Sequence, residues 1–159
     1  MEQQKFCIMI HYRNPFLYNA GSENYIISQI KYLKSRKINT LLIFPVRKKF
    51  MFTIKGWGVV GDSNFWGIKS SSSVKKMINK LNKQKNCVGI FIHSLIGCEV
   101  SEVKAMVTFG APVILYLHDY STCCVQYNLL RNDDVYCGDA CLSKLKCSKC
   151  KYFDFSVKL

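Results

Sequence analysis

The sequence has 159 residues, of which 49% are hydrophobic and 13% aromatic, so it can bury the core of about one domain and is not of the disordered type. It carries 23 lysines and arginines against 10 aspartates and glutamates, a formal net charge of +13. This excess favours a polyanionic partner: nucleic acid, an anionic membrane surface or a phosphate-bearing substrate. No apolar run approaches the roughly 18–20 residues that span a bilayer, and no signal peptide is visible, so we expect a cytoplasmic protein.

The beginning of the chain has the pattern of a strand, a helix and a second strand. Residues 5–11 form a short, almost continuous apolar run, which is typical of a strand buried on both faces. A loop follows, and Ser22 is expected to cap a helix whose apolar side chains recur at helical spacing as far as Leu33. Residues 40–44, closed by Pro45, predict the next strand. This order is that of a βαβ unit.

Residues 46–70 are harder to assign. Gly56, Gly58 and Gly61 indicate turns, and residues 50–54 alternate only loosely, as a strand would.

The alternation of helices and strands resumes at Ser71. One of residues 71–73 is expected to cap a helix, followed by a strand at 88–93, a helix at 99–109 and a strand at 113–117. Strands that alternate with helices predict an α/β domain, here a three-layer, Rossmann-like parallel sheet with helices on both faces. We place this domain at 1–120 and a cysteine-rich segment, packed on the same domain, at 121–159.

Ligands of such sheets bind beyond the carboxyl ends of the strands, and three sequence features fall there. Gly21 precedes the start of a helix, whose free N–H groups suit a phosphate or sugar oxygen, although a glycine there can also serve turn geometry alone. His93 and His118 each end a buried strand, where a histidine either acts on a substrate hydroxyl or is satisfied by the local backbone. Asp119 can orient the neighbouring ring or contact the ligand, which makes His118 the stronger candidate.

The cysteines are concentrated near the end of the sequence. Six of the nine lie between Cys123 and Cys150, and lysines flank the C-x-x-C pair, which favours the thiolate form. Two alternatives stay open: the thiols are free or oxidised, or four of them hold a structural zinc. The expected zinc ligands are Cys124, Cys137, Cys147 and Cys150, with Cys141 as the substitute for Cys124.

The helix that begins at Ser71 has one strongly basic side. Such a side is either a solvated surface or a contact for anionic lipid head groups. Nucleic acid is the less expected partner, because no arginine-aromatic groove or reading helix is recognisable. The basic residues are Lys75, Lys76, Lys80, Lys83 and Lys85.

Several short motifs occur in a familiar order: Gly21-Ser22-Glu23, Ile92-His93-Ser94-Leu95, Leu117-His118-Asp119-Tyr120, and then the cysteine tail. In this order the chain resembles the N-terminal half of a GT-B glycosyltransferase of the family 4 type, in the subset with a cysteine-bearing insertion after the His-Asp motif. It departs from that pattern at Ala20, where the family has the first of two adjacent glycines.

The resemblance implies transfer of a sugar from a nucleotide-sugar donor to a polysaccharide or lipid-linked acceptor. His118 and Asp119 are then catalytic, Gly21, Ser22, Glu23 and His93 bind substrate, and any zinc is structural. The family binds the donor mainly through a second domain with a Glu-x7-Glu motif, which these 159 residues lack, so we expect the chain alone to be inactive.

The resemblance also implies the partners. A donor-binding subunit and a place on the cytoplasmic face of a membrane fit this interpretation.

Two alternative functions belong to other classes: a small zinc-containing nucleic-acid-binding module, and a non-catalytic subunit that recruits a donor-binding partner to the membrane.

Overall fold

The computed structural model describes most of the first 118 residues and a few beyond them: 4–48, 51–62, 64–108, 110–118, 130–132, 135–137 and 150. The chain divides into two compact units, Met1–Tyr116 and Leu117–Leu159. In the second unit, β7 (Leu130–Arg131) and β8 (Val135–Tyr136) form an antiparallel pair. The domain boundary after residue 120 and the packing of 121–159 on the first domain stay predictions.

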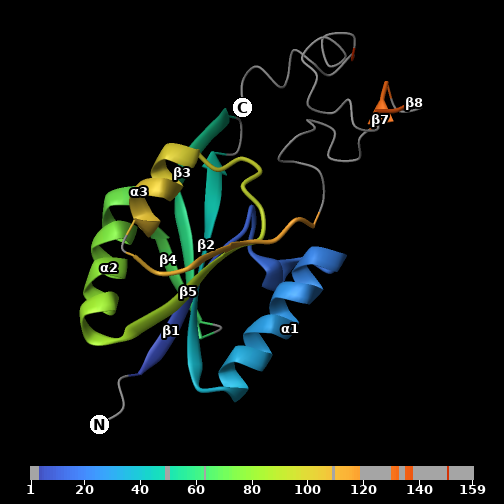
Figure 1. Ribbon diagram of the computed structural model, residues 1–159. Coiled ribbons are helices and arrows are strands. Elements are labelled where there is room, and N and C mark those ends of the chain that lie inside the picture. Colours follow the sequence, from blue (N-terminus) through green and yellow to red (C-terminus); the bar gives the residue numbers. More distant parts are fainter. Residues whose placement is uncertain are drawn as a thin grey trace. The chain divides into compact units, whose positions relative to one another are not determined.

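The first unit is built on a six-stranded sheet in the order β4-β3-β2-β1-β5-β6 (Figure 1). Strand β1 pairs in parallel with β2 and β5, and β5 pairs in parallel with β6. Strand β3, however, is antiparallel to both of its neighbours, so the expectation of an entirely parallel sheet was wrong. The strands are Lys5–Ile10, Ile38–Lys48, Met51–Gly61, Asn64–Lys69, Asn86–Ile92 and Val113–Leu115.

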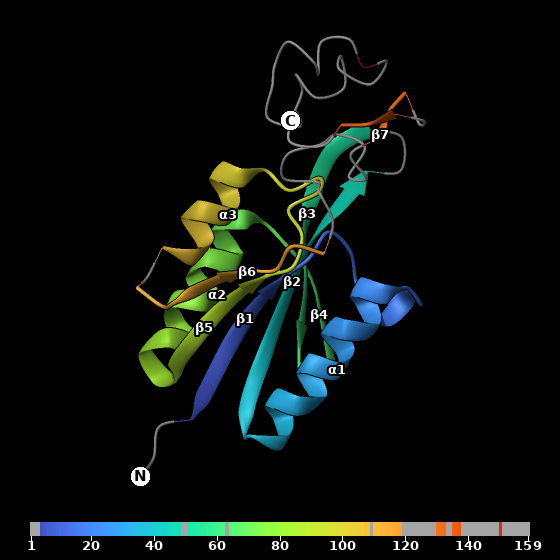
Figure 2. The same ribbon diagram turned by 45° about the vertical axis from the view of Figure 1, so that its right-hand side comes forward.

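Helices cover both faces of this sheet, as predicted (Figure 2). Helix α1 packs on one face through Ile26 and Ile30, and α2 and α3 pack on the other through residues such as Ile78 and Met106. A 3-10 turn, η1, lies between β1 and α1. The bounds are Pro15–Leu17 for η1, Gly21–Ser35 for α1, Ser71–Gln84 for α2 and Val100–Val107 for α3.

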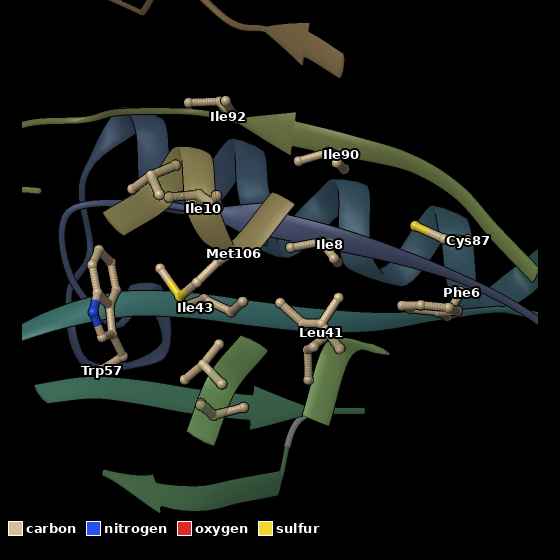
Figure 3. Packing of buried hydrophobic residues seen from close by; sticks show 14 residues of the cluster. Phe6, Ile8, Ile10, Leu41, Ile43, Trp57, Cys87, Ile90, Ile92 and Met106 are labelled. Atoms are coloured by element: carbon tan, nitrogen blue, oxygen red, sulfur yellow. The ribbon is translucent and has the colours of Figure 1, made fainter. Parts of the chain in front are cut away.

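The central strand β1 explains why the sheet needs both layers of helices. Its side chains alternate, with Ile8 and Ile10 in the core under α2 and α3 and Cys7 and Met9 in the core under α1. All four side chains are fully buried. Figure 3 shows Ile8 and Ile10 beside the strands that flank β1. An apolar run without polar alternation is what burial on two faces requires, and the sequence prediction for this strand is confirmed.

The segment after β2 corrects the sequence analysis. The glycines expected to form turns lie inside β3, in antiparallel register with β2 and β4. A Cβ on Gly58 would overlap the ring of Phe44, and one on Gly61 would overlap the ring of Trp66. These glycines therefore leave room for aromatic rings from the neighbouring strands.

Replacing Gly58 with alanine is expected to lower the free energy of unfolding by about 1–3 kcal/mol, because the new methyl group forces the buried Phe44 ring to move. Urea unfolding measures the change. Gly21→Ala is the matched control, since no described atom beyond the chain neighbours and the backbone of α1 itself lies within 4 Å of the Cβ position there. Equal stability of the two variants would contradict the packing of Phe44 on Gly58.

Candidate functional site

Three side chains are brought together where the parallel strands end. In the sheet register Ile10 is opposite Ile92, which is opposite Leu115, so the residues that follow these three positions are neighbours. The backbone continues the pairing for one step. The N–H of His93 donates to the carbonyl of Ile10 over 2.8 Å, and the N–H of Tyr116 donates to that of Ile92 over 2.8 Å. The carboxyl ends of β1, β5 and β6 thus position His11, His93 and Tyr116.

A buried carboxylate lies at the start of α1. Glu23 is fully buried, and three side chains donate to it: Arg13 Nε over 2.6 Å, Ser22 Oγ over 2.8 Å and Tyr12 OH over 2.9 Å. The ring of His11 is also close, with Nε2 3.4 Å from Oε1. We call these five residues the Glu23 cluster. It ties the first turn of α1 to the chain that leaves β1.

The charge state of Glu23 follows from these contacts. Burial by itself would raise the pKa of the carboxyl group, since it disfavours the charged form. The hydrogen bonds from Arg13, Ser22 and Tyr12 outweigh burial and hold the pKa well below its ordinary value of 4.5. Glu23 is therefore ionised and stabilises the fold, and its oxygens are directed at the protein's own donors.

A second group of side chains, the aromatic cluster, consists of Tyr25, Gln29, His93 and Tyr116. The His93 and Tyr116 rings stack with centroids 4.6 Å apart and planes 14° apart. Gln29 Nε2 donates to Tyr116 OH over 2.8 Å, and the Tyr25 ring lies 5.7 Å from that of Tyr116. His93 is 2% exposed, whereas Tyr25 is 47% exposed. The cluster thus presents one exposed aromatic ring beside the half-buried Gln29 and Tyr116 and the buried His93.

The predicted substrate-binding residues are divided between these clusters. Ser22 and Glu23 belong to the Glu23 cluster, and His93 belongs to the aromatic cluster. Gly21 is exposed as the first residue of α1, which has no side-chain cap. Their roles toward a substrate stay predictions, but the buried carboxylate of Glu23 contacts neighbours in the fold.

The predicted catalytic pair lies elsewhere in the chain. His118 is exposed and belongs to the second unit, and Asp119 lies outside the described residues. Their catalytic role therefore stays a prediction.

The predicted zinc ligands lie mostly outside the described residues. This applies to Cys124, Cys141 and Cys147, while Cys137 and Cys150 are half-buried free thiols. Within the described ranges no group of three or more potential metal ligands occurs. The zinc site stays a prediction.

The basic side of the helix after Ser71 is present as expected. In α2, Val74 and Ile78 are buried against the sheet. Among the described parts of the chain, no helix has the length and apolar character needed to cross a bilayer. The exposed basic residues of α2 are Lys75, Lys76, Lys80 and Lys83.

Sequence reasoning missed six residues of the two clusters. They are His11, Tyr12, Arg13, Tyr25, Gln29 and Tyr116. Arg13 had a usable signal, because it directly follows the first predicted strand and is the only lysine or arginine among residues 11–30.

No family model, curated protein or solved structure matches the chain.

Proposed function

We propose that this chain is the acceptor-binding part of a glycosyltransferase, with a Rossmann-like domain of the GT-B, family 4 type. The observation that carries the proposal is the aromatic cluster at the carboxyl ends of β1, β5 and β6. Sugars are bound in proteins by an aromatic face that covers the C–H side of the ring and by polar groups that meet its hydroxyls. Tyr25 offers the face, and Gln29 and Tyr116 offer the polar groups.

One atom of the cluster supports this assignment. Among the residues that the structure describes, none donates to the buried Oε1 of Gln29, while the other amide atom of the side chain donates to Tyr116 OH. A buried carbonyl oxygen without a donor costs about 1–3 kcal/mol. A sugar hydroxyl that enters beside Tyr25 would supply the donor.

In the proposed reaction an acceptor hydroxyl attacks the anomeric carbon of a nucleotide sugar. The new glycosidic C–O bond forms, the bond to the nucleoside diphosphate breaks, and the hydroxyl proton passes to the leaving diphosphate oxygen. The aromatic cluster holds the acceptor ring, and the Glu23 cluster fixes the loop before α1. His118, with Asp119, would contact the transferred sugar. The donor would be bound mainly by a second domain, in a longer chain or a separate subunit.

Nuclear magnetic resonance titration of the ¹⁵N-labelled chain with a short-chain polyprenyl diphosphate sugar tests the proposal. We expect the largest shifts at Tyr25, Gln29, His93 and Tyr116. Tyr25→Ala should weaken binding by about tenfold, which corresponds to about 1.4 kcal/mol. Tyr32→Ala is the control, because Tyr32 is an equally large and exposed ring (59%) near the other end of α1.

Three outcomes separate the alternatives. Shifts confined to residues outside the two clusters would contradict the proposed site. Binding of mixed oligonucleotides that falls steeply with salt would favour a nucleic-acid-binding module. Sugar binding without transfer in the presence of a donor-binding domain would favour a non-catalytic recruiting subunit.

A further inference from the structure

The segments that supply the two clusters contain little of the chain's positive charge. Residues 11–30, 93–103 and 110–118 supply both clusters and the segments next to them, and Arg13 is the only lysine or arginine in all three ranges. The whole sequence has 23 such residues. Any cationic recognition by these segments therefore depends on one guanidinium group.

The contacts of Arg13 hold this group in one orientation. Its Nε donates to the buried Glu23 over 2.6 Å. The guanidinium carbon lies 4.1 Å from the centre of the Tyr18 ring and 4.8 Å from that of Tyr12. A carboxylate and two aromatic rings thus restrain a side chain that otherwise has many rotamers. Little conformational entropy remains to be lost when Arg13 binds a ligand.

Part of this guanidinium is still available. Arg13 is 32% exposed, and within the described residues Glu23 is the acceptor that it contacts through Nε. A guanidinium has five N–H donors in a planar fork, and the Nη groups form the edge that binds two oxygens of a carboxylate or phosphate at once. Tyr18, which stacks on Arg13, is itself 49% exposed, so the pair faces solvent together.

The charge of Glu23 limits what this edge can bind. Glu23 offsets the charge of Arg13. A single anionic group matches the single arginine.

We propose that Arg13 is a specificity-determining residue that binds one anionic group, a carboxylate or a phosphate monoester, on the acceptor sugar. This inference rests on the proposed function. Arg13 selects acidic sugars over neutral ones as acceptors, with the anionic group on the guanidinium fork and the sugar ring on the aromatic cluster.

The test compares glucose, glucuronate, glucose 6-phosphate and inorganic phosphate as probes in the same resonance titration. The Arg13 Nε–H signal reports the anionic group, and Tyr25 reports the sugar ring. We expect at least one acidic sugar to bind about tenfold more tightly than glucose and to shift both signals. Comparison of glucuronate with glucose 6-phosphate distinguishes carboxylate from phosphate.

Variants connect the preference to Arg13. Arg13→Lys keeps a positive charge for Glu23 but loses the planar fork, so it should reduce the preference to less than about threefold. Arg13→Gln should remove the preference for acidic sugars altogether. Arg36→Lys is the control, because Arg36 also lies over a tyrosine, at 5.4 Å from Tyr32, but near the other end of α1. Thermal unfolding of each variant shows that it is folded.

The possible failures are distinct. If glucose and the acidic sugars shift Tyr25 with equal affinity, the inference is wrong and the proposed function stands. If the acidic probes shift only Arg13 and no sugar shifts Tyr25, Arg13 is an anion site and the proposed function is wrong. An Arg13 Nε–H signal that no anion moves, or a preference that Arg13→Lys retains in full, overturns the inference.

Discussion

Replacing Trp57 with alanine is expected to lower the free energy of unfolding by about 3–5 kcal/mol and Tm by about 10 °C. Trp57 is fully buried in the core under α2 and α3, and no other strand residue there is as large (Figure 3). Its Nε1 also donates to Glu102 Oε2 over 2.8 Å and to Ser71 Oγ over 3.0 Å. The truncation therefore opens a cavity and removes a link between β3, α2 and α3.

Two further variants separate packing from hydrogen bonding. Trp57→Phe keeps most of the ring volume, and Ser71 still donates to Glu102 over 2.6 Å. We therefore expect Trp57→Phe to lower the free energy of unfolding clearly less than Trp57→Ala does. Trp66→Ala is the control for loss of a tryptophan, because Trp66 is 42% exposed. Calorimetry or urea unfolding measures all three. A Trp57→Ala protein no less stable than Trp66→Ala would show that Trp57 does not fill this core.

The second large effect is expected at Glu23, where glutamine should lower the free energy of unfolding by about 3 kcal/mol at pH 7. Removal of one partner of a buried ion pair costs about 3–5 kcal/mol, and the partly exposed Arg13 can turn into water, which reduces the loss. Glu99→Gln is the control, since Glu99 is exposed and a surface change of this kind stays within about 0.5 kcal/mol.

The pH dependence of this difference follows from the lowered pKa of Glu23. A carboxyl group whose pKa is lower in the folded state stabilises the fold above its unfolded pKa, and that contribution is lost as the pH falls. The wild type should thus lose its advantage over Glu23→Gln progressively below about pH 4.5, the ordinary value. Urea unfolding at intervals from pH 7 to pH 3 measures it. A constant difference over this range would be inconsistent with an ionised Glu23.

The sequence alone predicted the elements whose patterns come from burial on two faces or at helical spacing. The runs that became β1 and β5 were identified to within two residues, and the cap of α2, expected among residues 71–73, is Ser70. Only the start of β3, within the candidate strand 50–54, was considered, and β4 was not predicted. The reason is that Gly58 and Gly61 have no side chain to show the alternation of a strand, and the rings that fill their space come from Phe44 and Trp66 on other strands.

The sequence predicted that a candidate site lies at the carboxyl ends of the parallel strands, but it identified only some of the residues that gather there. The ends of neighbouring parallel strands must lie together, which was enough to single out His93. Burial of Glu23 could not be foreseen, because acidic residues are exposed unless paired, and its partner Arg13 lies ten residues earlier in a loop. Tyr25 and Gln29 join the site only because of the rotation of α1 about its axis, which packing on the sheet decides.

The position of β1 in the sheet also determines the order in which the sheet can assemble. The strands β2, β3 and β4 are joined by short connections, so their antiparallel pairs can form as soon as residues 38–69 have been synthesised. By contrast, β1 is made first and occupies a central place, and its pairing with β5 joins Lys5 to Asn86. Closing so long a loop is slow. Until then one edge of β1, a strand buried on both faces in the folded unit, stays open, and such an edge is prone to pair with another chain.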